Sequence, residues 1–346
     1  MTETEVVVVG AGIMGVATAW ALARSGHEVV VLERFEPGHT HGSSHGTSRI
    51  FRHSYPDPLY VGMTIEARSL WRELEEETGR TLLEPTGALD LGGGLDDHKA
   101  ALSAHRLGSE ILSAADVSKR WPFVYLDEGE TALFQSDASM IRADEAISAF
   151  TGRAEVKGAA FSYSSPVTRI HQTDNGVVVS TESGEEIHAL TAVVTAGPWA
   201  KGLLAEVGIE LVVRPTRETI AYFSFDSADG NVVPALVEWG EPTVYSLAAP
   251  GEGIKAGEHI AGPTADPDAP SAPDEESVQR VSEWIRRRFG RELPLLRAET
   301  CFYTNTEDES FVLERHGNIV VGSACSGHAF KFAPLVGTRL ERLATS

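Results

Sequence analysis

The first forty residues contain the pattern that most restricts how this chain can fold. An unbroken apolar run at residues 6–9 is followed directly by Gly-Ala-Gly-Ile-Met-Gly at residues 10–15, and a second apolar run at residues 29–32 ends on Glu33. A strand, a glycine-rich turn, a helix and a second strand ending on an acid form the dinucleotide-binding βαβ unit. The sequence therefore predicts a nucleotide site at this turn. The alternative is a glycine turn in an ordinary βαβ unit.

Each glycine of the turn has its own physical reason. Gly10 permits the tight turn, Gly12 lets the backbone approach a pyrophosphate, and Gly15 lets the helix pack closely on the strand. The N-terminus of the helix offers free N–H groups and the positive end of its dipole to phosphate. Glu33 lies eighteen residues after Gly15, where a carboxylate can bind ribose hydroxyls.

Charge and cysteine content narrow the class of protein. The 346 residues include 50 Asp and Glu against 29 Lys and Arg, a net charge of −21. Such a surface repels nucleic acids and anionic membranes, so we expect neither as a partner. Two cysteines cannot form a disulfide framework and indicate a reducing compartment. We see no signal peptide and no membrane-spanning apolar run, and we expect a cytoplasmic protein without a metal site.

The two ends of the chain differ from its middle in the secondary structure that their sequences predict. Both ends show buried-strand and helix patterns typical of a nucleotide-binding domain, whereas much of the middle is rich in short strands. We therefore predict an α/β fold with two discontinuous domains. A Rossmann-like cofactor domain would comprise residues 1–84, 141–215 and 300–346, and a β-rich substrate domain would comprise residues 85–140 and 216–299.

Four separated motifs carry a family resemblance. They lie at residues 9–15, 42–53 (GSSHGTSRIFRH), 301–304 (CFYT) and 326–332 (SGHAFKF). Together and in this order they resemble the monomeric sarcosine oxidase and N-methyltryptophan oxidase family of the glycine oxidase/D-amino-acid oxidase flavoproteins. The resemblance implies an FAD-binding Rossmann-like domain, a β-rich substrate-binding domain and a monomer. It also implies oxidation of the C–N bond of a secondary amino acid by O2, giving an imine or aldehyde, an amino acid and H2O2.

Cys301 is the most specific consequence of the resemblance. In the family, the cysteine of this segment forms a thioether to the 8α-methyl group of FAD, and a thiolate is the nucleophile that such a bond needs. The alternative for Cys301 is a buried structural cysteine. Cys325 has no matching role, and we expect it only to pack.

Arg52 and Lys331 match the two cations that hold the substrate carboxylate in the family. A guanidinium fork and an ammonium can together fix an amino acid by its carboxylate. Lys331 also stands between two phenylalanines in an apolar stretch, where an unpaired lysine is costly. The alternative for Arg52 is a surface ion pair.

Lys255 matches the family's lysine that activates oxygen beside the flavin, where a fixed positive charge stabilises developing superoxide. Arg49 and Ser48 align with residues on the same side. His259 and Tyr245 align with active-site residues on the substrate side, although His259 is equally compatible with a surface position. Thr304 aligns with a small pocket residue.

The resemblance also implies a set of cofactor contacts. These are Gly10, Gly12, Ile13, Met14, Gly15, Glu33, Arg34, Ser43, His45, Ser48, Arg49, Val167, Gly197, Trp199, Cys301, Gly327, His328, Phe330 and Lys331.

Departures from the family pattern leave the substrate open. Only Tyr245 remains where the family often has paired tyrosines, Ala329 replaces a common glycine, and the chain is shorter than typical members. A larger substrate, such as N-methyltryptophan, a fructosyl amino acid or a cyclic imino acid, is one alternative. An NAD(P)-linked dehydrogenase and a nucleotide-binding regulatory protein are remoter ones, because neither requires Cys301 or Lys255.

Overall fold

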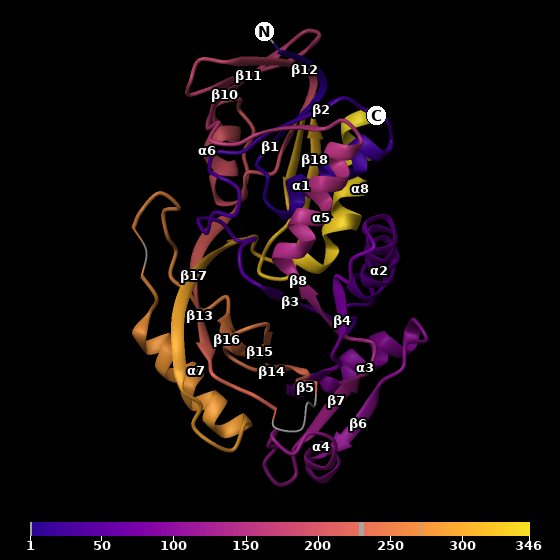
Figure 1. Cartoon of the computed structure of the whole chain (residues 1–346), viewed down its shortest axis with the longest axis vertical. Coiled ribbons are helices and arrows are strands. Elements are labelled where there is room, and N and C mark those ends of the chain that lie inside the picture. The colour runs from indigo at the N-terminus through magenta and orange to yellow at the C-terminus, as the bar shows by residue number, and fades with distance from the viewer. Residues whose placement is uncertain (1, 228–231, 271) are drawn as a thin grey trace.

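Two large β-sheets lie one above the other in the computed structural model, which describes residues 2–227, 232–270 and 272–346 (Figure 1). The upper sheet has the order β10-β11-β12-β1-β2-β9, with β19 beside β12 and β18 beside β19. Its strands are β1 (Thr2–Val9), β2 (Val29–Leu32), β9 (Ala160–Ser162), β10 (Val167–Thr173), β11 (Gly176–Thr181), β12 (Glu186–Val194), β18 (Val312–His316) and β19 (Ile319–Ser323). The strands around β1 are parallel, and β10, β11 and β18 are antiparallel additions.

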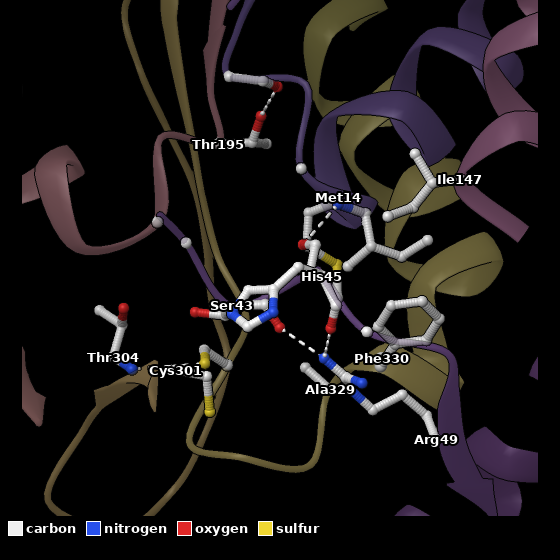
Figure 2. A pocket seen from close by; sticks show the side chains of 18 of the residues that line it. Met14, Ser43, His45, Arg49, Ile147, Thr195, Cys301, Thr304, Ala329 and Phe330 are labelled. Atoms are coloured by element: carbon white, nitrogen blue, oxygen red, sulfur yellow. Dashed lines mark hydrogen bonds between the residues drawn. The ribbon is translucent and has the colours of Figure 1, made fainter. Parts of the chain in front are cut away.

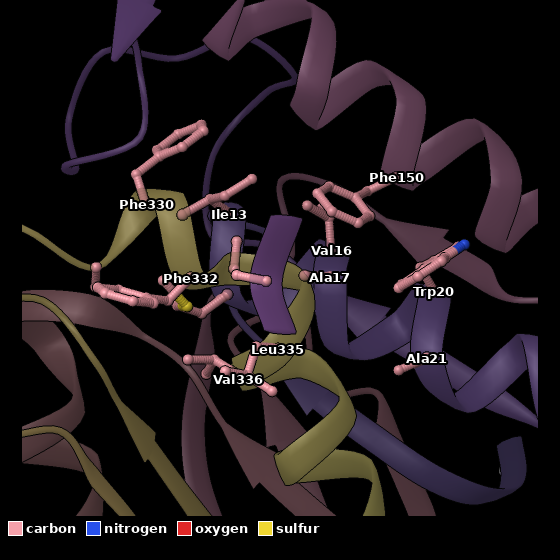
Figure 3. Close-up of a cluster of buried hydrophobic side chains, with 14 of the residues drawn as sticks. Ile13, Val16, Ala17, Trp20, Ala21, Phe150, Phe330, Phe332, Leu335 and Val336 are labelled. Atoms are coloured by element: carbon pink, nitrogen blue, oxygen red, sulfur yellow. The ribbon is translucent and has the colours of Figure 1, made fainter. Parts of the chain in front are cut away.

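Helices α1 (Ile13–Arg24), α5 (Ala143–Val156) and α8 (Ala333–Thr345) cover one face of the upper sheet (Figure 3). The small residues of α1 permit close approach, since a Cβ on Gly337 of α8 would lie 2.4 Å from the carbonyl oxygen of Ala17. Trp20 and Phe150 fill the α1–α5 contact with ring centroids 5.4 Å apart. The helix that follows the glycine turn is therefore fixed from two sides.

The lower sheet has the order β17-β13-β16-β15-β14-β5-β7-β6. Its strands are β5 (Ala88–Gly92), β6 (Glu110–Ser113), β7 (Thr131–Gln135), β13 (Arg214–Phe223), β14 (Ala235–Trp239), β15 (Thr243–Ala249), β16 (Gly253–His259) and β17 (Leu295–Asn305). Helix α7 (Glu275–Arg288) packs on this sheet through Val281, Trp284 and Ile285. The smaller helices nearby are α3 (Leu95–Ala104) and α4 (Ala114–Arg120).

A three-stranded sheet of β3 (Ser48–Phe51), β8 (Ser139–Arg142) and β4 (Leu83–Pro85) lies between the two large sheets. Helix α2 (Pro58–Thr78) follows it. As its sequence predicts, Asp57 caps the helix by accepting from Leu59 N, and Gly79 ends it in the left-handed conformation. The short helix α6 (Ala200–Ala205) completes the fold, and none of the described helices is long and apolar enough to cross a membrane.

The mixed α/β architecture confirms the predicted fold class. Among the strands that were not foreseen, three carry residues of the candidate site. Strand β3 begins inside the motif at residues 42–53, and β16 and β17 carry Lys255 and Cys301 on regular strands. Strand β12 joins the antiparallel part of the upper sheet to its parallel part, because it pairs with β11 on one side and β1 on the other. The division into domains stays a prediction, and its boundary at residue 300 falls within β17.

Candidate active site

A single large cavity contains almost all the residues that the sequence singled out. It has a volume of about 1730 Å³ and is lined by the glycine turn, the loop before β3, the lower sheet and the segment before α8. A usual small-molecule pocket measures roughly 300–1000 Å³. The space is therefore large enough for a cofactor and a substrate together.

The glycine turn forms one wall of the cavity. Gly10 has a φ of 101°, and Gly10 and Gly12 both line the space. Gly15 is not among the residues that line it, and its predicted contact with the cofactor stays a prediction. A Cβ there would lie 1.8 Å from the carbonyl oxygen of Gly10, so this glycine serves the packing of α1 under the turn. Glu33 is buried, and its carboxylate accepts from Ala11 N at 2.7 Å.

Arg49 holds the loop before β3 (Figure 2). Its guanidinium donates to the carbonyl oxygens of Ser43 at 2.9 Å, His45 at 2.7 Å and Ser48 at 2.8 Å. The neighbouring Ser44 accepts from Ile13 N at 3.0 Å and so ties the loop to the start of α1. The polar loop thus has internal reasons to be ordered.

Arg34 and Trp199 line the cavity and share one acidic partner. Arg34 Nη1 lies 2.8 Å from Asp268 Oδ1, and Trp199 Nε1 donates to the same oxygen at 3.0 Å. Val167 and Gly197 line the cavity as well. These contacts connect the loop after β16 to the wall that Glu33 belongs to.

Cys301 lies on β17 and lines the cavity (Figure 2). Burial raises the pKa of its thiol to about 12, and the positive charges of Arg49 and Lys255 act in the opposite direction. Cys325, which also lines the cavity, accepts a hydrogen bond from Thr304 N at 3.3 Å. Burial thus keeps Cys301 in its thiol form, whereas the two nearby cations favour the thiolate.

Lys255 is buried on β16, and its Nζ donates to Ser48 O at 2.6 Å. Burial, and then the charge of Arg49, lower the pKa of Lys255, Glu299 is the largest influence that raises it, and the resulting pKa is about 7. Glu299 itself accepts from the Tyr222 hydroxyl at 2.6 Å. Lys255 is therefore poised between its charged and neutral forms near neutral pH.

Arg52 stands between two aromatic rings. Its guanidinium carbon lies 4.9 Å from the ring centroids of both Tyr55 and Trp239. Its Nη1 lies 3.7 Å from Asp90 Oδ1 and has no hydrogen-bond partner within the described residues. Trp239 Nε1 donates to the same Asp90 oxygen at 2.9 Å. A buried cation with an unused donor thus lines the cavity.

Lys331 is the second cation of this region, and it is 6% exposed. Its Nζ donates to the Tyr55 hydroxyl at 2.8 Å and to His328 O at 2.7 Å. Burial, and then the charge of Arg52, hold the pKa of Lys331 well below its usual range. Tyr55 therefore connects the two cations, since its ring packs on Arg52 and its hydroxyl contacts Lys331.

The remaining substrate-side candidates also line the cavity. Burial raises the pKa of Tyr245. His259 lies 3.5 Å from Glu309 through its Nε2, and its ring centroid is 5.6 Å from that of Tyr303. The hydroxyl of Thr304 is buried without a partner in the described part of the chain.

Sequence reasoning missed Tyr55, Asp90, Trp239 and Glu299. Asp90 alone left a visible signal, because it is a charged residue between two leucines, Leu89 and Leu91. Tyr55, Trp239 and Glu299 line the cavity because of strand pairing or the path of a loop, and no local sequence pattern predicts either. Across the described residues, no group of three or more His, Cys, Asp or Glu side chains is arranged to hold a metal ion.

Comparisons with known proteins agree with this geometry. The model of a family described as "FAD dependent oxidoreductase" matches residues 5–343. The monomeric sarcosine oxidase of Bacillus sp. (strain NS-129) is 32% identical, with 100% of this chain and 94% of the relative covered. Human peroxisomal sarcosine oxidase is 33% identical over 98% of this chain and 91% of its own length. The N-methyl-L-tryptophan oxidase of Salmonella heidelberg (strain SL476) is 30% identical, with coverages of 96% and 92%.

Solved structures show the same fold. NikD, described as an unusual amino acid oxidase essential for nikkomycin biosynthesis, superposes with a TM-score of 0.89 at 28% identity, covering 100% of this chain and 95% of NikD. The L-proline dehydrogenase of P. horikoshii has a TM-score of 0.89 at 24% identity, with coverages of 99% and 94%. The full-length family match and the three relatives at 30% identity or more confirm the resemblance, and the chain belongs to the family of FAD-dependent oxidoreductases.

Proposed function

We propose that this chain is an FAD-dependent oxidase of the C–N bond of an N-substituted amino acid. The products would be an imine, which water converts to an aldehyde and an amino acid, and H2O2. The observation that carries the proposal is the pair of buried cations, Arg52 and Lys331, in the same cavity as the glycine turn. A carboxylate is the ligand that such a pair accommodates.

The residues present fit FAD. Gly12 supplies no side-chain cap to α1, and Ser44 occupies only the first amide, that of Ile13, so the amides that follow can receive a pyrophosphate. Glu33 lies where it can accept from ribose hydroxyls. His45 and Thr304 also line the cavity, and each has a buried side-chain atom, Nε2 and Oγ1, without a hydrogen-bond partner among the described residues. FAD, when bound, supplies the two-electron acceptor for the amine, and O2 regenerates it.

Arg52 supplies the strongest support for carboxylate binding. Its Nη1 has no hydrogen-bond partner in the described structure, and Arg52 is one of the residues that line the cavity. The rings of Tyr55 and Trp239 fix the plane of the guanidinium, so its free edge has a defined direction. A substrate carboxylate would satisfy this donor and would bring the negative charge that Lys331 lacks.

Lys255 would stabilise negative charge that develops on oxygen. Its ammonium is buried, and its link to the Ser48 carbonyl fixes its position. Preorganised charge in such a site is worth far more than in water. Because the pKa of Lys255 is about 7, the charge is present at lower pH and is lost as the pH rises through 7.

We also propose that Cys301 binds FAD covalently. The test is to denature the protein in acid and to separate precipitate from supernatant. Yellow colour should stay with the precipitate of the wild type and of Cys325→Ser, and should move to the supernatant for Cys301→Ser. Colour released from the wild type would rule out the thioether.

A peroxide assay over a panel of substrates tests the reaction itself. The panel would contain sarcosine, N-methyltryptophan, cyclic imino acids and fructosyl amino acids. The larger substrates stay in the proposal because the cavity is wide and one relative is named N-methyl-L-tryptophan oxidase. Substrate-dependent reduction of NAD(P)+ without peroxide would favour a dehydrogenase instead.

We further propose that the protein acts as a monomer in the cytoplasm. The name of the Bacillus relative supports the monomer, and two free cysteines are typical of a reducing compartment. Light scattering of the holoenzyme would check the mass, and a dimer would contradict the first part.

A further inference from the structure

Lys331 is a buried lysine without a counter-ion in the part of the chain that the structure describes. Its Nζ contacts a phenol oxygen and a backbone carbonyl, both neutral. No carboxylate of the described residues lies within ion-pair distance of it, whereas Arg52 has Asp90 at 3.7 Å and Arg49 contacts three carbonyl oxygens. Lys255 also lacks an ion pair among the described residues, but the charges of Glu299 and Asp144 raise its pKa, while burial and Arg52 lower that of Lys331. An ammonium buried in this way loses its hydration and receives no ionic compensation.

The groups that face Lys331 from each packed element do not supply that compensation. Arg52, after β3, is positive, and its charge is matched by Asp90 of β5 rather than shared with Lys331. Burial raises the pKa of Tyr55, and burial lowers the pKa of His328 to about 3, so both are neutral near pH 7. Glu309, after β17, lies near His259 instead. Without a substrate, this part of the cavity therefore contains the ion pair of Arg52 with Asp90, and Lys331 without an acidic partner among the described residues.

We propose that Lys331 is uncharged in the empty cavity and becomes an ammonium only when a substrate carboxylate arrives, by taking the proton of the substrate's own ammonium. The inference rests on the proposed function, in which Lys331 and Arg52 bind that carboxylate. Two of the three hydrogen-bonding positions around Lys331 Nζ are occupied by the Tyr55 hydroxyl and the His328 carbonyl, and Lys331 lines the cavity. The third position is thus available on the substrate side.

The proposed step transfers one proton from the substrate to Lys331 and conserves all atoms. One N–H bond of the substrate's ammonium breaks, one N–H bond forms on Lys331, and no electrons are gained or lost. The zwitterion becomes an amine with a free electron pair, which oxidation of its C–N bond needs, and the new ammonium pairs with the carboxylate. Because the substrate brings both the proton and the anion, the net charge of the region stays unchanged and no separate base is required.

Isothermal titration of the holoenzyme tests the inference on wild-type protein. Acetate, which carries no ammonium, should bind with uptake of about one proton, measured in buffers of different ionisation enthalpy, and its Kd should weaken about tenfold per pH unit between about pH 7 and 9. N,N-dimethylglycine, a zwitterion, should bind in the absence of O2 with almost no net proton exchange and a constant Kd.

Variants identify the group that takes the proton. Lys331→Arg is charged at every pH of the titration, so acetate should bind to it without proton uptake, and Lys331→Met should also lack the uptake. Lys201→Met, which alters an exposed lysine of α6, is the matched control and should retain it.

Two failures are distinguishable. If the wild type binds acetate without taking up a proton, or if Lys331→Arg still takes one up, the inference about Lys331 is wrong and the carboxylate site stands. If neither ligand binds the wild type, the proposed carboxylate site fails, and the inference fails with it.

Discussion

Two buried lysines line the same cavity and differ in what surrounds them. Lys255 is 2% exposed and Lys331 is 6% exposed, so burial alone does not separate them. Lys255 has Glu299 and Asp144 to offset Arg49, and its pKa is lowered only to about 7. Lys331 faces Arg52 with no acid of its own, and its pKa falls well below the usual range. The difference in pKa between the two lysines therefore comes from nearby charged residues more than from the extent of burial.

Lys255→Met should have the largest effect. Removing a preorganised charge at a developing anion costs about 100- to 1000-fold in rate, so reoxidation of the reduced flavin by O2 should slow by that factor. Anaerobic reduction by substrate should stay within about twofold, because Lys255 is not placed at the carboxylate site. Stopped-flow measurement of each half-reaction gives both rates. Equal slowing of reoxidation in Lys331→Met would break the distinction between the two lysines.

Arg52→Gln should come next. A hydrogen bond between charged groups contributes about 1.5–3 kcal/mol, so the Kd of acetate should rise roughly 10- to 150-fold. The charge of Arg52 lowers the pKa of Lys331, so its removal raises that pKa and should reduce the proton uptake on acetate binding. Titration calorimetry reports both quantities. An unchanged Kd would remove Arg52 from the carboxylate site.

Glu299→Gln should have an intermediate effect, confined to Lys255. The carboxylate raises the pKa of Lys255, so the variant should lower that pKa by about one unit, the smaller end of the usual range for a nearby charge. At neutral pH, flavin reoxidation should then slow by up to about tenfold and recover in more acidic buffer. Glu252→Gln, which shares the partner Arg297, is the control and should keep the wild-type pH profile. If Glu299→Gln also kept the wild-type pH profile, Glu299 would not control the pKa of Lys255.

Tyr55→Phe should have the smallest effect, confined to the Lys331 region. The ring on Arg52 remains, whereas the hydroxyl that Lys331 Nζ contacts at 2.8 Å is lost. A single hydrogen bond contributes about 1 kcal/mol, so acetate affinity should fall about fivefold. Reoxidation by O2 should be unaffected. A change in reoxidation without a change in acetate affinity would mean that the two regions are coupled through Tyr55.

The residues of the four motifs were predictable, because each motif supplies its chemistry within a short stretch. Arg52, Lys331, Lys255 and Cys301 were named from sequence and meet in one cavity, while their roles stay predictions. Gly15 of the same fingerprint was predicted to let the helix pack closely, and a Cβ there would lie 1.8 Å from the carbonyl oxygen of Gly10; its contact with the cofactor stays a prediction.

The partners of these residues were not predictable. Asp90 and Trp239 approach Arg52 because β5 and β14 pair in parallel, with Val237 opposite Asp90 and Trp239 opposite Gly92. Glu299 lies near Lys255 because β13 pairs with both β16 and β17. Strand register is a property of the assembled sheet and leaves no local trace.

The sequence by itself determined the family, the nucleotide turn and the chemical groups available, because backbone conformation at glycine and side-chain chemistry are local properties. Only the tertiary structure decided the charge states. A lysine's protonation depends on the solvent it loses and on the ions that folding brings near it, and those ions come from residues far away in the chain. For this reason the two lysines differ: Glu299 and Asp144 raise the pKa of Lys255, whereas burial and Arg52 lower the pKa of Lys331.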